Sequence, residues 1–157
     1  MWHSMQKANR QKMKKDEPIG LACDHAGYEL KEALRGYLQG LGYTVVDYGT
    51  YSPASVDYPD FAQRLADGLG RGEVRCGVAM CGTGNGISMA LNRHHGVRAA
   101  LCWQPELARL ARAHNDANVV SLPARFVSYD EATAIVSAFL DGVFEGGRHQ
   151  RRIDKIG

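Results

Sequence analysis

The sequence predicts an α/β domain organised around a parallel β-sheet. Short apolar and β-branched runs alternate with longer stretches in which apolar residues recur at helical spacing. Strands that alternate with helices pair in parallel, because each helix carries the chain back to the edge at which the next strand begins. The length of 157 residues fits one compact domain. We place this domain at residues 18–157, after an extension of residues 1–17 that we expect to be disordered.

The first half of the domain contains two expected strands and two expected helices. Residues 19–23 form an uninterrupted apolar run, and residues 43–48 are β-branched and aromatic, which is typical of strands. Between them, apolar residues recur at helical spacing over residues 30–41. A second helix is expected over residues 58–69, where Pro59 suits the first helical turn.

The second half of the domain is predicted to contain three strands and three helices. The strands are short apolar runs at residues 78–80, 97–101 and 119–122. The helices are a short one that ends at residue 91 and two longer ones over residues 105–114 and 128–143. Ser128 and Glu131 match a capping box at the start of the last helix. Gly146 and Gly147 end this helix, and we expect a basic tail to follow.

Composition excludes several classes of protein. Hydrophobic residues make up 45% of the chain, yet none of its apolar runs approaches the length that spans a bilayer, so we expect no membrane partner. Residues 1–17 lack the apolar segment of a secretory signal. The four cysteines form no CxxC pair. We therefore expect a cytoplasmic protein with free thiols.

The net charge of +2 arises in the N-terminal extension. Residues 1–17 hold five basic and two acidic residues, which leaves 14 basic and 15 acidic residues in the domain. A protein that binds nucleic acid needs a basic face on the fold itself. We therefore expect no nucleic-acid partner.

The most informative segment follows the third expected strand and reads Cys81-Gly82-Thr83-Gly84-Asn85-Gly86. Glycines let the backbone approach a ligand closely, and amides at the start of a helix bind anions. Such amides beside a thiol also favour the reactive thiolate. A tight turn with an inert buried cysteine is the alternative, and the segment alone leaves both open. It is not a Walker loop, because no Gly-Lys-Ser/Thr follows, and residue 87 is Ile where a cysteine phosphatase needs arginine.

Two further polar segments lie at the ends of expected elements. Asp24 and His25 follow the first strand, at the edge where parallel sheets bind ligands. They could move protons or bind a sugar hydroxyl and a phosphate, or they could be a helix cap and a surface histidine. His114 and Asn115 lie between a helix and the fifth strand. They could be a proton-transferring histidine with an amide beside it, or a polar helix exit with asparagine in a left-handed conformation.

Basic residues near the C-terminus offer a possible phosphate site. Arg148 and Arg152 are four residues apart, so on a helix they could clamp a phosphate from one face, or they could complement a helix dipole. Arg125, after the fifth strand, is either another phosphate ligand or a solvated surface charge. We expect three cysteines to be small buried hydrophobes, namely Cys23, Cys76 and Cys102. The spacing of cysteines and histidines matches no known type of metal site.

Taken together, these segments resemble the type B ribose-5-phosphate isomerases and their galactose-6-phosphate isomerase relatives. The matching segments run in family order and cover about residues 18–157. They are residues 23–27, Asp57-Tyr58-Pro59, residues 81–86, Gly96-Val97-Arg98-Ala99, residues 114–119 and Glu145-Gly146-Gly147-Arg148-His149. The resemblance implies a three-layer αβα, Rossmann-like domain with a five-stranded parallel sheet.

The resemblance implies an aldose–ketose isomerase that interconverts ribose 5-phosphate and ribulose 5-phosphate through a cis-enediolate. Cys81 would transfer the proton between C2 and C1, and His114 would open the furanose ring with help from Asp24. Thr83 and the amides of residues 82–86 would stabilise the charge of the enediolate. The residues implied to bind the substrate are His25, Tyr58, Gly82, Gly84, Asn85, Gly86, Asn115, Arg125, Arg148 and Arg152.

The resemblance further implies that the reaction needs neither a metal nor an organic cofactor. It implies a homodimer or homotetramer whose sites lie between subunits, with His114, Asn115 and Arg125 serving a site on the neighbouring subunit. Two alternatives stay open. The substrate could be a six-carbon sugar phosphate, such as allose or galactose 6-phosphate, or the protein could be a non-catalytic sugar-phosphate sensor.

Overall fold

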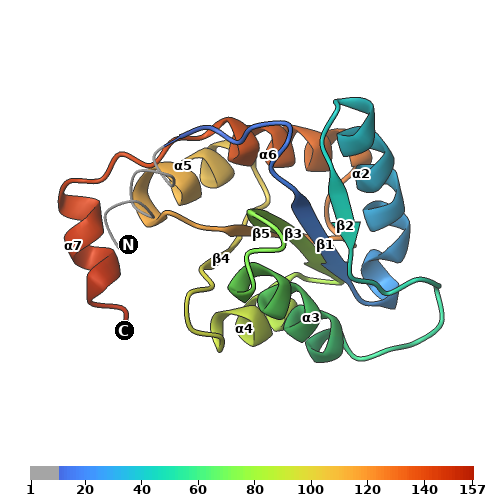
Figure 1. Cartoon of the computed structure of the whole chain (residues 1–157). Helices are drawn as coiled ribbons and strands as arrows, with labels where there is room; N and C mark the ends of the chain where they lie inside the picture. Colours follow the sequence, from blue (N-terminus) through green and yellow to red (C-terminus); the bar gives the residue numbers. More distant parts are fainter. Residues whose placement is uncertain (1–10) are drawn as a thin grey trace.

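The computed structural model describes residues 11–157, and the part of the predicted extension formed by residues 1–10 lies outside the described residues. Within the described part, the chain folds into a parallel sheet of five strands between two layers of helices (Figure 1). The strand order is β2-β1-β3-β5-β4. The predicted fold class, a three-layer α/β domain with a five-stranded parallel sheet, is confirmed.

The bounds of the elements follow the alternation seen in the sequence. The strands are β1 (Ile19–Cys23), β2 (Val45–Asp47), β3 (Cys76–Cys81), β4 (Ala99–Leu101) and β5 (Val119–Pro123). The helices are the short η1 (His25–Gly27), then α2 (Tyr28–Gly40), α3 (Tyr58–Gly70), α4 (Asn85–Asn92), α5 (Pro105–Asn115), α6 (Tyr129–Asp141) and α7 (Arg148–Asp154).

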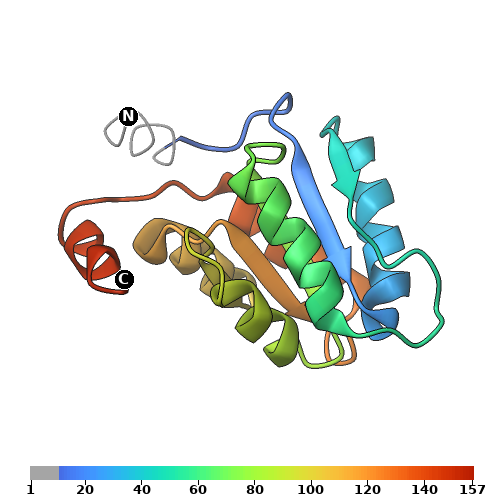
Figure 2. The same cartoon turned by 60° about the horizontal axis from the view of Figure 1, so that its bottom comes forward.

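The two faces of the sheet are covered by different helices. Helices α2, α5 and α6 lie on one face and α3 and α4 on the other (Figures 1 and 2). The central strands β1, β3 and β5 are therefore buried at every position, which explains their continuous apolar runs. Their side chains alternate between two cores, so that Val78 faces the α2, α5 and α6 layer whereas Ala79 and Cys81 face α3 and α4.

A buried lysine holds the loop after β2 against the end of β1. Lys31 on α2 is fully buried, and its ammonium donates to both carboxylate oxygens of Asp47 at 2.8 and 2.7 Å and to the carbonyl of Thr50 at 2.6 Å. The backbone amide of Thr50 in turn donates to the carbonyl of Cys23 at 2.9 Å. These hydrogen bonds hold the end of β1, directly before Asp24, more firmly than apolar packing alone would.

Three differences from the sequence predictions concern element ends. Helix α6 ends at Asp141 rather than at residue 143. The edge strands β2 and β4 have three residues each and are shorter than predicted. The expected basic tail after Gly147 is helix α7, and only His149 within it is buried.

Residues 11–17 of the predicted extension contact the domain. Lys12 forms an ion pair of 3.0 Å with Asp141 on α6, and Glu17 forms one of 3.0 Å with Arg75. Met13 packs against the core between the sheet and α2, α5 and α6. Among residues 11–157, the helices are all too short or too polar to cross a membrane.

Candidate active site

The glycine loop joins the end of β3 to the start of α4. Gly84 adopts the left-handed conformation, with φ of 78°, and a Cβ atom there would lie 2.5 Å from the Leu101 side chain and 3.1 Å from the carbonyl of Leu122. Both the backbone angle and the close approach therefore require glycine. The hydroxyl of Thr83 accepts a hydrogen bond of 3.2 Å from the amide of Asn85, which is one of the amides that a helix start leaves unpaired.

Cys81 is the last residue of β3 and lies directly before this loop. Its side chain is a free thiol, and the residue is 5% exposed. Its carbonyl accepts a hydrogen bond of 2.9 Å from the amide of Ala124, so β5 holds the end of β3 in place. The sulfur is therefore fixed at the carboxyl edge of the sheet, beside the glycine loop.

Asp24 lies at the same edge as Cys81. Because Cys23 of β1 pairs with Met80 of β3, the next residues on the two strands, Asp24 and Cys81, are neighbours at the strand ends. Asp24 Oδ1 accepts hydrogen bonds from the amides of Ala26 and Gly27 at 3.0 and 3.2 Å, so Asp24 caps η1. Both bonds use Oδ1, which leaves Oδ2 for a ligand.

His25 and Tyr58 complete the lining of this edge. The Nδ1 atom of His25 lies 3.2 Å from both the amide and the carbonyl of Val56, in the loop before α3. Tyr58 begins α3, and a Cβ atom at Gly86 would lie 2.5 Å from its ring. The tyrosine ring thus covers the glycine loop, and only glycine at residue 86 leaves room for it.

Arg125 lies over the glycine loop of its own chain. Its amide donates to the carbonyl of Gly82 at 3.0 Å, and a Cβ atom at Gly82 would lie 3.2 Å from the Nη1 of the guanidinium. We expected Arg125 to serve the neighbouring subunit, but in this structure it lies beside the glycine loop of its own chain. The tight turn after β5 brings Arg125 back to Cys81 and Gly82 within one chain.

His114 and Asn115 lie at the opposite edge of the sheet. They end α5, which runs antiparallel to the strands, and the chain then enters β5, where the carbonyl of Asn118 accepts from the amide of Gly77 at 2.8 Å. Gly77 is near the start of β3 and Cys81 is at its end. At about 3.3 Å per residue, the four steps between them span about 13 Å. One chain therefore keeps His114 apart from Cys81.

The corner after Asn115 is held by charged groups that sequence reasoning did not single out. Asp116, and not an asparagine, adopts the left-handed conformation, with φ of 47°. Its carboxylate is bound by Arg112 at 3.1 Å and by Arg98 at 3.2 Å. Burial lowers the pKa of Arg112, but the nearby Asp116 opposes this shift. No periodic signal in the sequence distinguishes these arginines from surface charges.

His114 stacks on a second histidine, His149 of α7. Their ring centroids are 4.2 Å apart and their planes differ by 12°. The Nε2 atoms of both rings lie 3.7 Å from the same carboxylate oxygen, Oε1 of Glu145. Sequence reasoning assigned no role to Glu145 or His149, although both lie in a segment that carried the family resemblance. We refer to these three residues as the His–Glu–His cluster.

Arg148 and Arg152 flank this cluster on α7. Both side chains are exposed, and within residues 11–157 neither forms an ion pair. Helix α7 stands beside α5 and far from the carboxyl edge of the sheet (Figures 1 and 2). The predicted site residues thus divide into two groups. Asp24, His25, Tyr58, residues 81–86 and Arg125 lie at one edge, and His114, Asn115, Arg148 and Arg152 lie at the other.

The other three cysteines are poor candidates for chemistry. They are 0%, 4% and 1% exposed in the order Cys23, Cys76 and Cys102, as predicted for small buried hydrophobes. Burial raises the pKa of Cys23 and of Cys76 to about 12 and that of Cys102 to about 11. These thiols stay protonated at neutral pH.

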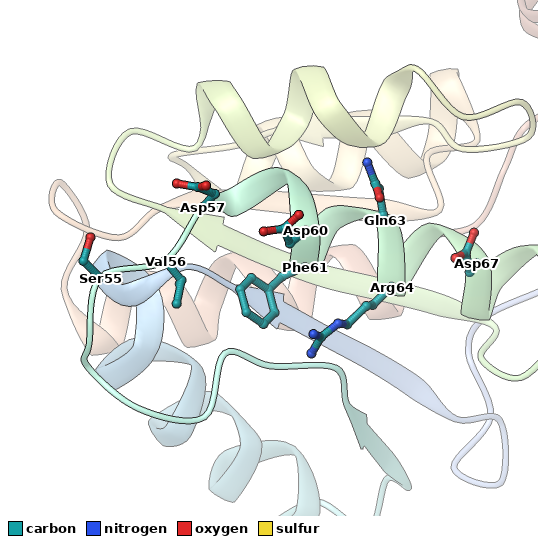
Figure 3. A pocket seen from close by; sticks show the side chains of 8 residues that line it. All are labelled: Ser55, Val56, Asp57, Asp60, Phe61, Gln63, Arg64 and Asp67. Atoms are coloured by element: carbon teal, nitrogen blue, oxygen red, sulfur yellow. The ribbon is translucent and has the colours of Figure 1, made fainter.

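A separate hollow of about 530 Å³ lies along the first turns of α3 (Figure 3). Three aspartates, Asp57, Asp60 and Asp67, line it together with a single arginine, Arg64. None of the predicted site residues lines it. Because its formal charge is negative, this hollow does not suit a sugar phosphate.

Comparison with known proteins identifies the family. The sequence profile described as Ribose/Galactose Isomerase matches residues 19–156. The chain belongs to this family. Ribose-5-phosphate isomerase B of Escherichia coli is 44% identical over 138 residues, which cover 88% of this chain and 93% of that protein. The predicted family is therefore confirmed.

Solved structures of this family have the same fold. The ribose 5-phosphate isomerase of Thermotoga maritima is 51% identical with a TM-score of 0.88, over 89% of this chain and 97% of that one. Ribose-5-phosphate isomerase B of Mycoplasma genitalium, solved with bound ribulose-5-phosphate, is 46% identical with a TM-score of 0.86, over 91% of this chain and 95% of that one.

Proposed function

We propose that this protein interconverts ribose 5-phosphate and ribulose 5-phosphate. The observation that carries the proposal is a free thiol fixed at the end of β3, directly before a glycine loop that opens a helix. This arrangement supplies a base and an anion site within one turn of chain. The names of relatives at 44–51% identity support the same reaction.

In the proposed reaction, Cys81 is the base that moves the proton between carbons. The thiolate takes the proton from C2 of the open-chain aldose, and the electron pair of that bond forms the C1–C2 double bond of an enediolate. The proton on the C2 oxygen passes to the negative C1 oxygen, Cys81 returns its own proton to C1, and the electron pair of the double bond shifts as the carbonyl forms at C2. Thr83 and the amides of residues 82–86 stabilise the negative charge on the oxygen. This stabilisation is strongest in the transition state.

The ring of ribose 5-phosphate must open before this step. The bond between C1 and the ring oxygen breaks, its electron pair goes to the ring oxygen, and this oxygen takes a proton from His114. The hydroxyl on C1 loses its proton to Asp24 as the C1 carbonyl forms. Imidazole and carboxyl groups transfer protons in this way when they lie within hydrogen-bonding reach of the substrate.

We further propose that the working unit is a homodimer or homotetramer with shared sites. Within one chain, Cys81 and His114 lie at opposite edges of the sheet, so a single chain cannot bring both to one sugar. A two-fold arrangement would place the His114 edge of one chain against the Cys81 edge of another. Arg148 and Arg152 would then bind the phosphate from one chain, and His25 and Arg125 from the other.

The variant Cys81→Ala tests the base. We expect ketose formation from ribose 5-phosphate to fall by about a thousandfold while the fold is retained, because general-base catalysis is lost. The measurement is ketose formation together with deuterium exchange at C1 of ribulose 5-phosphate in D₂O. Cys102→Ala is the matched control, since it removes a thiol that is buried elsewhere. Exchange at the wild-type rate in Cys81→Ala would refute the assignment of the base.

A further inference from the structure

The His–Glu–His cluster contains a buried polar atom that the fold itself does not satisfy. His149 is 7% exposed, and within residues 11–157 its Nε2 has no hydrogen-bond partner. Buried polar atoms are nearly always paired in native proteins, so each exception needs a reason. The groups that face this atom are the carboxylate of Glu145 and the ring of His114.

The chain around His149 is built so that its ring stays over His114. The amide of Glu145 donates to the carbonyl of Ala113 at 3.0 Å, which ties the segment before α7 to the last turn of α5. Gly146 and Gly147 then turn the chain with φ of 70° and 57°, and the first turn of α7 brings the His149 ring against the His114 ring of α5. Helix α7 has no apolar face of its own, and His149 is its one buried residue.

A metal ion is not the best explanation for this cluster, although the three side chains lie within reach of one. A histidine nitrogen binds a metal through a lone pair in the plane of its ring. The planes of His114 and His149 differ by only 12° in a stack. Nearly parallel planes share no point close to both rings, so one ion cannot lie in both without a rotation that breaks the stack.

We propose that Glu145 and His149 are positioning residues for His114 in opening the sugar ring. This inference rests on the proposed function. The stacked ring of His149 fixes the plane of the His114 ring, and the Glu145 carboxylate stabilises the imidazolium from which the ring oxygen takes its proton. Opening the furanose then needs no reorientation of the acid.

The charges around the stack support this division of roles. Burial lowers the pKa of His149, and His114, Arg148 and Arg152 lower it further, whereas Glu145 raises it. The surroundings therefore favour the neutral form of His149, which suits a ring that stacks on its neighbour. The charged groups that face the cluster are Arg109 on α5, Glu145 before α7, and Arg148 and Arg152 on α7.

A positioning role of Glu145 and His149 can be distinguished from a purely structural role by comparing the two directions of the reaction. Ribulose 5-phosphate cannot close a furanose ring, because its C5 oxygen carries the phosphate. Deuterium exchange at its C1 therefore requires Cys81 but no ring opening. Ribose 5-phosphate, in contrast, must be opened. A defect in ring opening therefore lowers the rate of ribose 5-phosphate conversion but not the rate of deuterium exchange into ribulose 5-phosphate.

The variants are Glu145→Gln, His149→Ala and His149→Phe, with Arg151→Gln on the exposed side of α7 as the control. We expect His149→Ala and Glu145→Gln to lower kcat/KM for ribose 5-phosphate by about tenfold. Exchange into ribulose 5-phosphate should stay within about twofold, since positioning affects the ring-opening step alone. His149→Phe, which keeps a stacked ring, should recover part of the loss.

Three outcomes overturn the proposal. They are equal losses in both reactions, no loss for ribose 5-phosphate, and a Phe variant no better than the Ala variant. Because Glu145 is half exposed, the Glu145→Gln protein tests the idea even if His149→Ala unfolds. Failure of the proposed function looks different, since the wild-type protein would then neither form ketose nor catalyse exchange.

Discussion

At the scale of single residues, the glycines of the loop have different physical tasks. Gly84 adopts a left-handed backbone and touches the backbone of β5, whereas Gly82 and Gly86 leave room for the side chains of Arg125 and Tyr58. The loop is thus covered by two residues that come from distant parts of the chain. The proposed anion site is therefore shaped by Arg125, after β5, and by Tyr58 of α3 as well as by the loop.

Gly84→Ala should reduce both stability and activity. The left-handed backbone costs about 1–2 kcal/mol for alanine, and the overlap with Leu101 and Leu122 adds about 1–3 kcal/mol. Gly72→Ala is the matched control, because Gly72 has a similar φ of 73° but no atom within 4 Å of a Cβ. Urea unfolding and ketose formation are the measurements. Equal losses of stability in the two variants would contradict a role for close packing.

The sequence could indicate candidate site residues that lie beside glycines or at strand ends, but not candidates that depend on tertiary contacts. Residues 81–86 and Asp24 follow apolar runs, so a local pattern places them. Glu145 and His149 gain their place only when α7 folds back on α5. Arg125 was predicted as a candidate, but its position on its own loop depends on the pairing of β5 with β3.

At the scale of elements, burial and capping were visible in the sequence, whereas α7 was not. The strands that are covered on both faces appear as apolar runs, and the capping box of α6 forms as predicted from Ser128 and Glu131. Helix α7 has no apolar stripe and follows two glycines, so it resembles a basic tail. The only residue that α7 buries is His149. Helical periodicity detects a repeated apolar pattern, so it cannot detect a helix held by one contact.

Ser128→Ala should destabilise the protein by about 1 kcal/mol, because the amide of Glu131 loses the hydroxyl that caps it. Ser128→Asp retains a capping oxygen and should stay close to wild type. Urea unfolding measures the difference. A loss in the Asp variant as large as that in the Ala variant would show that the serine acts through something other than the cap.

The same box should add to stability in a defined pH range. The backbone amide and hydroxyl of Ser128 lower the pKa of Glu131 below its ordinary value of 4.5. A depressed carboxyl pKa stabilises the fold fully above about pH 4.5, and the contribution is lost as the pH falls through the lower, folded pKa. Glu131→Gln should therefore remove this part of the acid dependence, which urea unfolding between pH 3 and 7 would detect.

At the scale of the whole molecule, the parallel sheet separates the two halves of the proposed site. Helices that connect parallel strands must end at the amino edge, so the exit of α5 carries His114 to that edge while β3 carries Cys81 to the other. The sequence alone does not give the distance between Cys81 and His114, because this distance depends on the direction and length of the strands. The proposed reaction would therefore need two copies of the chain to join these residues at one substrate.

Mixing two inactive variants tests this arrangement directly. Cys81→Ala and His114→Ala proteins are each expected to have little activity on ribose 5-phosphate. If they are unfolded and refolded together in equal amounts, half of the dimers contain one chain of each kind. In such a dimer, one site combines both defects and the other combines the intact Cys81 of one chain with the intact His114 of its partner. Activity should therefore recover to about a quarter of the wild-type value, as two-fold symmetry requires.

Each variant refolded alone is the control. If the site formed within one chain, every site in the mixture would carry a defect, and no recovery would occur.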